Sequence, residues 1–218
     1  WGERVIYTHI SLSVLIQAVL SVSLLARLQG LARTALSVVA IAVLSWGVEA
    51  LGSATGIPFG EYHYTDRLQP QIAHVPLLIP AAWMMMLPPS WAVGRWLSGK
   101  GSRLTFIALS ALAITAWDLF LDPQMVQWEL WLWDQPGGYF GIPWVNYAGW
   151  FVSSALITAA AHPKDAPSRP LLVVYTLTWL LETVGLAAFW GLPGPAICGF
   201  FGMGILTMLA WRAERRAR

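Results

Sequence analysis

The stretch WGVEALGSATGIPFGEYHYT, residues 46–65, joins a long apolar run to a polar loop and places an acid, Glu49, before the apolar run has ended. A carboxylate inside an apolar helix is costly in a membrane and marks a candidate functional site. The GIPFG segment that follows is rich in residues that interrupt helices, so we expect the chain to turn back there. The stretch therefore predicts an apolar helix that ends beside a functional polar loop.

Apolar runs of similar length recur along the chain. Of its 218 residues, 57% are hydrophobic and 11% are charged, whereas about a quarter of the residues of a soluble domain are charged. A run of roughly 18 apolar residues can cross the hydrocarbon core of a bilayer as a helix, because a helix satisfies its own backbone hydrogen bonds. The sequence predicts an all-α transmembrane bundle, one integral membrane domain over residues 1–218, with seven spans: Val5–Leu25, Thr34–Ser53, Val75–Leu97, Leu104–Leu121, Trp144–Ala161, Leu171–Trp190 and Pro195–Trp211.

Lysine and arginine are divided unevenly between the two sets of loops. Eleven of the thirteen follow spans one, three, five and seven, and only Arg4 and Arg67 fall on the other side. Cytoplasmic loops of membrane proteins carry the excess of Lys and Arg. This pattern predicts a multi-pass protein of the cell membrane with its N-terminus outside and its C-terminus in the cytoplasm.

Three acids lie within apolar runs: Glu49 in span two, Asp118 in span four and Glu182 in span six. Spans two and six share a weak repeat, in which Trp precedes the acid by three residues and Gly follows it by three. Internal repeats in membrane proteins often frame a common site. We therefore expect the three acids to point into one cavity toward the outer leaflet. The alternative is that they form buried polar contacts that lock the helices together.

Asp118 and Asp122 are four residues apart, so they lie on one face of a helix. Two carboxylates that are close and partly desolvated do not both ionise easily, and we expect them to share one proton. Such a pair can act as a general acid at neutral pH. The alternative is that Asp122, which precedes Pro123, simply ends the helix at the membrane interface.

The chain contains fourteen Trp. Trp and Tyr commonly form belts at membrane interfaces, and this explains most of the tryptophans in the loops. Aromatic faces also attract cations, so a Trp-lined pocket suits a transient carbocation or a long conjugated substrate. The loop after span two brings acids and histidines beside tyrosines, but no HExxH or comparable spacing indicates a metal site.

Two classes of membrane protein are excluded by missing residues. A retinal protein needs a lysine within a span for its Schiff base, and both lysines, Lys100 and Lys164, lie in predicted cytoplasmic loops. An intramembrane prenyltransferase needs paired Asp-rich motifs that bind a diphosphate through magnesium. The DLFLD motif at residues 118–122 has no second copy.

Four blocks in a fixed order resemble the membrane-integral carotenoid hydratase family, which includes bisanhydrobacterioruberin hydratase and γ-carotene 1′,2′-hydratase. The blocks are EALGSATGIPFGEYHYT, HVPLLIPAAWMMM, WDLFLDPQMV and WLWDQPGGYFGIPWVNYAGW, and they lie between Trp46 and Trp150. The resemblance implies an enzyme that adds water to the terminal ψ-end double bond of an acyclic or monocyclic carotenoid, such as lycopene or a bacterioruberin precursor.

This implied chemistry needs an acid, a water-handling base and aromatic faces for a tertiary cation, and it requires no cofactor. We expect Asp118, sharing its proton with Asp122, to be the acid, and Glu49 to orient the water or accept its proton. The residues expected to contact the substrate or its polar surroundings are Glu61, His63, Tyr64, Trp83, Trp117, Asn146, Trp150 and Glu182.

Two other functions remain open from the sequence. In a membrane lycopene cyclase the same protonation would be followed by capture of the cation by a neighbouring double bond. A carotenoid- or lipid-binding subunit of a larger membrane complex would perform no catalysis. The expected partners are a carotenoid and membrane lipids, with no nucleic acid, and an association with other membrane enzymes of carotenoid biosynthesis is compatible with this interpretation.

Overall fold

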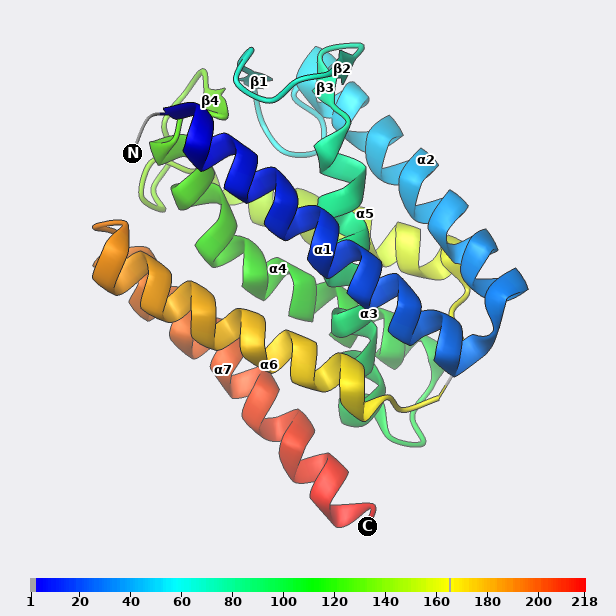
Figure 1. The fold of residues 1–218 in the computed structure, drawn as a ribbon. Helices are drawn as coiled ribbons and strands as arrows, with labels where there is room; N and C mark the ends of the chain where they lie inside the picture. The colour runs from blue at the N-terminus through cyan, green and yellow to red at the C-terminus, as the bar shows by residue number, and fades with distance from the viewer. Residues whose placement is uncertain (1–2, 165) are drawn as a thin grey trace.

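The computed structural model of the chain describes residues 3–164 and 166–218. Within these residues the fold is a bundle of seven α-helices (Figure 1). They occupy the places that the apolar runs predict, although the third begins three residues later than expected. The helices are α1 (Glu3–Gln29), α2 (Leu31–Thr55), α3 (Leu78–Ser98), α4 (Arg103–Gln127), α5 (Trp144–Ala161), α6 (Arg169–Val184) and α7 (Pro193–Arg216), and α6 continues into a π-helical segment, η1 (Gly185–Phe189).

Five of the helices in the described part of the chain are long and apolar enough to cross a membrane: α1, α2, α4, α6 together with η1, and α7. Helices α3 and α5 fall outside this group. Helix α1 begins and α7 ends at opposite ends of the bundle (Figure 1), as an odd number of crossings requires. The helical membrane bundle is thus confirmed, while seven spans and the orientation in the membrane stay predictions.

The ends of several helices follow local sequence signals. The hydroxyls of Ser102 and Ser168 accept hydrogen bonds from backbone N–H groups in the first turns of α4 and α6, as N-cap serines do. Helix α2 ends at Gly56, whose left-handed φ of 76° is easily adopted by glycine. The turn expected after the apolar run is therefore produced by this glycine.

Helix α3 lies at the centre of the bundle and packs against α1, α2, α4, α6 and α7 (Figure 1). It contains Pro88 and Pro89 in its interior, and a proline has no N–H to donate to the carbonyl four residues earlier. Pro89 therefore leaves the Met85 carbonyl without its helical donor. The hydroxyl of Ser21 on α1 donates to that carbonyl at 2.8 Å, which replaces the missing bond.

A lid covers the end of the bundle where α2 and α4 end; we define it as residues 56–77 and 128–143. It contains two small antiparallel sheets that the sequence did not predict. Strand β1 (Tyr62–Tyr64) pairs with β4 (Trp131–Trp133), and β2 (Gln71–Ile72) pairs with β3 (Val75–Pro76). The pairing of β3 explains why α3 begins at Leu78 and not at Val75.

One ring of the lid packs closely between two helices of the bundle. Phe59 is 2% exposed and lies between Gly52 of α2 and Gly149 of α5, since a Cβ added at these glycines would come within 2.8 and 2.7 Å of its ring. No side chain larger than hydrogen fits at either position without moving the ring. The two glycines thus fix how closely the lid approaches the helices.

Candidate active site

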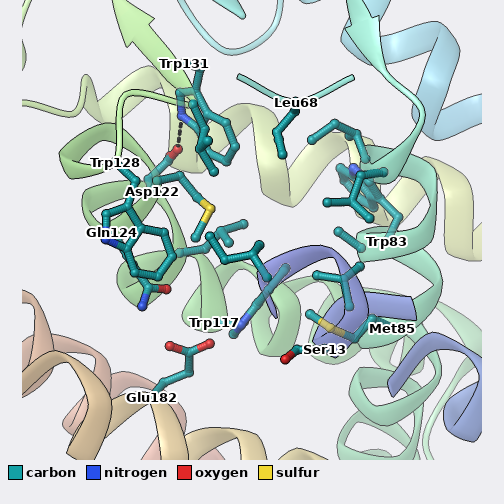
Figure 2. Close-up of a pocket in the computed structure, with 18 of the residues that line it drawn as sticks. Ser13, Leu68, Trp83, Met85, Trp117, Asp122, Gln124, Trp128, Trp131 and Glu182 are labelled. Atoms are coloured by element: carbon teal, nitrogen blue, oxygen red, sulfur yellow. Dashed lines mark hydrogen bonds between the residues drawn. The ribbon is translucent and has the colours of Figure 1, made fainter. Parts of the chain in front are cut away.

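A cavity of about 850 Å3 lies beneath the lid. Pockets for small molecules commonly have volumes of about 300–1,000 Å3. Side chains from α1 to α6, η1, β1 and β4 line it, and most are apolar or aromatic. Figure 2 shows several of them around the opening. The polar side chains on the wall are His9, Ser13, Gln17, Glu49, Tyr62, Tyr64, Asp122, Gln124, Asn146, Thr178 and Glu182.

Glu49 is held firmly at the lid end of the cavity. Its carboxylate is 5% exposed, and one oxygen, Oε2, accepts hydrogen bonds from the hydroxyls of Tyr62 and Tyr64 at 2.7 Å each. The other oxygen, Oε1, accepts from the indole N–H of Trp83 at 3.2 Å. These three donors hold the Glu49 carboxyl group in one orientation.

The two tyrosines remain donors at any ordinary pH. Burial, and next the charge of Glu49, raise the pKa of the Tyr62 and Tyr64 hydroxyls above the usual value of 10.0. The two side chains reach Glu49 together because residues i and i+2 of a strand point to the same side. Tyr62 is a site residue that our sequence analysis did not select, although the YHY alternation carried the signal.

A second cluster joins Asp118 and Asp122, one turn apart on α4. The side-chain amide of Asn146 on α5 donates to Oδ2 of Asp118 at 2.8 Å and also to Oδ2 of Asp122. The indole N–H of Trp131 on β4 donates to Oδ1 of Asp122 at 2.8 Å (Figure 2). All three polar side chains on the helices are 2% exposed or less. The expected pairing of the two aspartates is thus present in the structure.

The two carboxyl groups of this cluster also lie within hydrogen-bond reach of each other. A hydrogen bond between two carboxyl groups requires that one of them carry a proton. Oδ1 of Asp118 receives no N–H or O–H donor from the described residues, whereas both oxygens of Asp122 do. The geometry therefore suits one proton shared by the pair.

Asp122 faces the cavity, but Asp118 does not line its wall. Asp118 is fully buried behind Asn146 and Asp122. A proton donor must reach the reacting atom within hydrogen-bond distance. The sequence placed the acid at Asp118, and the structure instead leaves Asp122 as the member of the pair that a bound molecule can touch.

Three of the tryptophans in the wall contact one another. Trp83 and Trp150 stack with ring centroids 4.5 Å apart and planes 8° apart, and Trp117 meets Trp150 edge-on at 6.0 Å. All three line the cavity, as the sequence predicted. Trp83 also donates a hydrogen bond to Glu49, so this carboxyl group is held against the aromatic wall.

Glu182 lines the cavity from α6, on the side that faces α1. Neighbouring polar groups are Gln17 and Thr178, which are joined by a hydrogen bond of 3.0 Å between the Gln17 amide and the Thr178 hydroxyl. The indole N–H of Trp117 points toward the Glu182 carboxylate in Figure 2. The cavity therefore has two polar regions, one under the lid and one between α1 and α6.

Two residues expected at the cavity mouth lie elsewhere. Glu61 and His63 are exposed and are absent from the cavity wall. His63 sits between Tyr62 and Tyr64 on β1, so its side chain points to the opposite face, where its Nδ1 pairs with Asp134 at 2.9 Å. The geometry gives neither residue a contact with a molecule in the cavity.

The comparison with protein families identifies the chain. Residues 8–206 match the model of a family described as carotenoid biosynthesis protein. The chain belongs to this family. It is also 32% identical over 127 residues to bisanhydrobacterioruberin hydratase of Haloarcula japonica, and the aligned part covers 57% of this chain and 43% of that protein. The match thus spans less than half of the relative's length. No solved structure matches the chain.

Within the described residues, this carotenoid biosynthesis protein has no group of three or more His, Cys, Asp or Glu side chains placed to hold a metal ion. The carboxyl groups of Glu49 and Asp122 accept hydrogen bonds from aromatic hydroxyls, indole N–H groups and one amide. Trp131, like Tyr62, is a site residue that the sequence did not predict. Its role depends on the pairing of β4 with β1, which brings together segments about seventy residues apart.

Proposed function

We propose that the chain is a carotenoid hydratase that adds water across the terminal ψ-end double bond of an acyclic or monocyclic carotenoid. The observation that carries this proposal is the carboxyl pair Asp118–Asp122, which opens through Asp122 onto a tryptophan-lined cavity. Family membership and the name of the Haloarcula relative support the same class of reaction.

The first step is transfer of the shared proton from Asp122 to carbon 2 of the terminal alkene. The π electrons form the new C–H bond, and a tertiary carbocation remains at carbon 1. Asn146 and Trp131 stabilise the Asp122 carboxylate that is left behind, because both continue to donate to it. Their hydrogen bonds also fix its orientation, so the proton is delivered at one position in the cavity.

The cation is stabilised by the wall opposite this acid. The faces of Trp83, Trp117 and Trp150 offer cation–π attraction of about 0.5–2 kcal/mol each, depending on how dry the contact is. The anion of Glu49, fixed by its three donors before the reaction, adds an electrostatic term that needs no reorganisation. These groups therefore favour the transition state more than the neutral alkene.

In the second step the oxygen of a water molecule bonds to carbon 1. The oxonium ion then loses one proton to a cavity carboxylate, for which we assign Glu49, and the product is a tertiary alcohol. The proton returns to the aspartate pair through solvent before the next cycle. The net reaction adds one H2O to one double bond, without oxidation or reduction.

The substrate and the place of the reaction follow from the membrane. A carotenoid is insoluble in water and roughly as long as the bilayer core is thick, so its enzyme must take it from the lipid. Exposed residues of α1 and η1, including His9, Ser13 and Phe189, line the cavity. We propose that the polyene enters sideways between these two elements, with its end group under the lid and toward the outer leaflet.

Expression in a lycopene-accumulating bacterium tests the proposal. Extracted pigment is separated by chromatography and its mass is measured by mass spectrometry. The same experiment is done with the Asp122→Asn variant and with a control, Asp66→Asn at an exposed residue, at matched levels in the membrane. A hydratase gives a product heavier by one water with an unchanged visible spectrum, and only Asp122→Asn loses it.

The alternatives give different pigments. A product of unchanged mass with a shifted spectrum would identify a cyclase. If lycopene and a longer acyclic carotenoid both bind but neither changes, the chain is a binding subunit and the hydratase assignment is refuted.

A further inference from the structure

The carboxylates of the cavity differ sharply in how many donors they have. Glu49 accepts three hydrogen bonds and Asp122 accepts two. Glu182 accepts none of normal geometry from the described residues, although it is partly buried and lines the same cavity. Its oxygens are therefore available to a bound molecule.

The indole N–H of Trp117 faces this free carboxylate. Trp117 is 0% exposed, and its N–H lacks a hydrogen-bond partner of normal distance and angle among the described residues. The N–H lies within hydrogen-bond reach of the Glu182 carboxyl group and points toward it in Figure 2, but it makes no hydrogen bond of normal distance and angle there. A buried donor left unpaired costs about 1–3 kcal/mol, so an acceptor placed better, beside the pair, would stabilise this N–H.

A hydroxyl oxygen satisfies both groups at once. Its lone pair accepts the Trp117 N–H, and its O–H donates to the Glu182 carboxylate. A carbonyl or an ether oxygen could accept but not donate, and an alkyl group could do neither. The hydroxyl and carboxamide of Thr178 and Gln17 lie on the same wall but bond each other, so they do not compete for this position.

We propose that Glu182 and the Trp117 indole N–H form a second subsite of the cavity, which binds a hydroxyl oxygen. The oxygen belongs either to the nucleophilic water or to an alcohol on the carotenoid. This inference rests on the proposed hydratase function, because that reaction is what brings both kinds of hydroxyl into the cavity. It gives Glu182 a defined task that is distinct from those of Asp122 and Glu49.

Two nearly isosteric variants test the subsite. Glu182→Gln removes the anionic acceptor, and Trp117→Phe removes the N–H while keeping an aromatic ring. Trp96→Phe is the matched control, because the Trp96 N–H is also buried and has no hydrogen-bond partner in the described part of the chain, but it lies outside the cavity. Each purified variant is assayed for lycopene hydration and, separately, for binding of lycopene and of its monohydroxylated product by quenching of tryptophan fluorescence.

The two sources of the hydroxyl give different results. If the subsite holds the water, Glu182→Gln lowers kcat by at least tenfold and leaves both affinities unchanged. If it holds the alcohol, Glu182→Gln weakens binding of the hydroxylated product about tenfold, equal to about 1.4 kcal/mol, and weakens lycopene binding much less. Trp117→Phe, which also alters the wall that contacts the polyene, weakens binding of the product more than binding of lycopene. In both cases Trp96→Phe behaves as the wild type.

Wild-type rates and affinities in Glu182→Gln would overturn the subsite. This outcome is separable from failure of the hydratase proposal. If Asp122→Asn is inactive while Glu182→Gln is fully active, the proposed hydration reaction is supported and only the subsite is refuted. If the wild type hydrates nothing, the binding measurement still decides whether a hydroxylated carotenoid is preferred. Should Trp117→Phe not fold, Glu182→Gln carries the test alone.

Discussion

Replacing Asp118 with Asn separates the structural role of the aspartate pair from its proton. Among the described residues, Asp118 accepts one hydrogen bond, from Asn146, and its other oxygen receives no N–H or O–H donor. In Asp118→Asn the amide oxygen keeps the bond from Asn146, and the amide NH2 points to the Asp122 carboxyl, where the shared proton lies in the wild type. The variant therefore imitates the singly protonated pair but has no proton to give.

The same change at Asp122 is not equivalent. Asp122 accepts from two donors, the Trp131 indole and the Asn146 amide, one on each oxygen. An asparagine has one carbonyl oxygen, so one of these donors would meet an NH2 group. We expect a loss of about 1.5–3 kcal/mol of stability for Asp122→Asn, the value of one hydrogen bond to a charged group, and less than about 1 kcal/mol for Asp118→Asn.

Both variants should lose the general acid. Proton transfer by a positioned side chain contributes typically a factor of about 10² to 10⁴, so we expect a fall of that size in the rate of hydration. The assay is the initial rate of product formation from lycopene by purified enzyme in detergent, with thermal unfolding followed by tryptophan fluorescence. An Asp118→Asn variant with the wild-type rate would refute proton sharing, and full activity in both variants would refute the assignment of the acid.

Three further predictions concern the supports of the site. Ser21→Ala removes the donor to the Met85 carbonyl, so we expect a loss of about 0.6–1.7 kcal/mol, seen as a lower unfolding midpoint in detergent. Gly149→Ala places a Cβ 2.7 Å from a lid carbonyl. Overpacking of this kind costs about 1–3 kcal/mol of stability, and we expect it to displace the lid and slow hydration. The control Gly47→Ala, which has open space around it, should change neither the stability nor the rate. Burial and the neighbouring Glu49 carboxyl group raise the pKa of Tyr62 above 10.0. Above that pH the hydroxyl ionises in the unfolded chain but not in the folded one, so the stability of the fold decreases as pH rises. A Tyr62→Phe variant whose stability decreased just as steeply with pH would contradict this.

Much of the fold could be predicted from local patterns. The seven helices lie where apolar runs indicated them, and α5 has the predicted bounds. The choice of Glu49, Trp83, Asn146 and Trp150 as cavity residues also agrees with their positions on the wall. An acid within an apolar run is visible without knowledge of the partners that surround it, because its cost in the membrane is a local property.

The lid residues were harder to assign. Residues 61–64, EYHY, are all polar or aromatic. Their order alone does not indicate which side chains face the cavity. Pairing with β4 fixes the register, so Tyr64 reaches Glu49 and His63 points away. In a strand a shift by one residue exchanges the two faces, and this register depends on a segment far along the chain.

The sequence by itself determined the class of protein, the position of its helices and the presence of acids within apolar helices. These properties depend on one segment and its solvent at a time. Only the tertiary structure decided that Asp122 and not Asp118 faces the cavity, that Glu49 accepts three hydrogen bonds, and that the Trp117 N–H points toward Glu182. Those facts require the mutual placement of α2, α4, α5, α6 and the lid, because the direction of a buried side chain has meaning only relative to the elements packed around it.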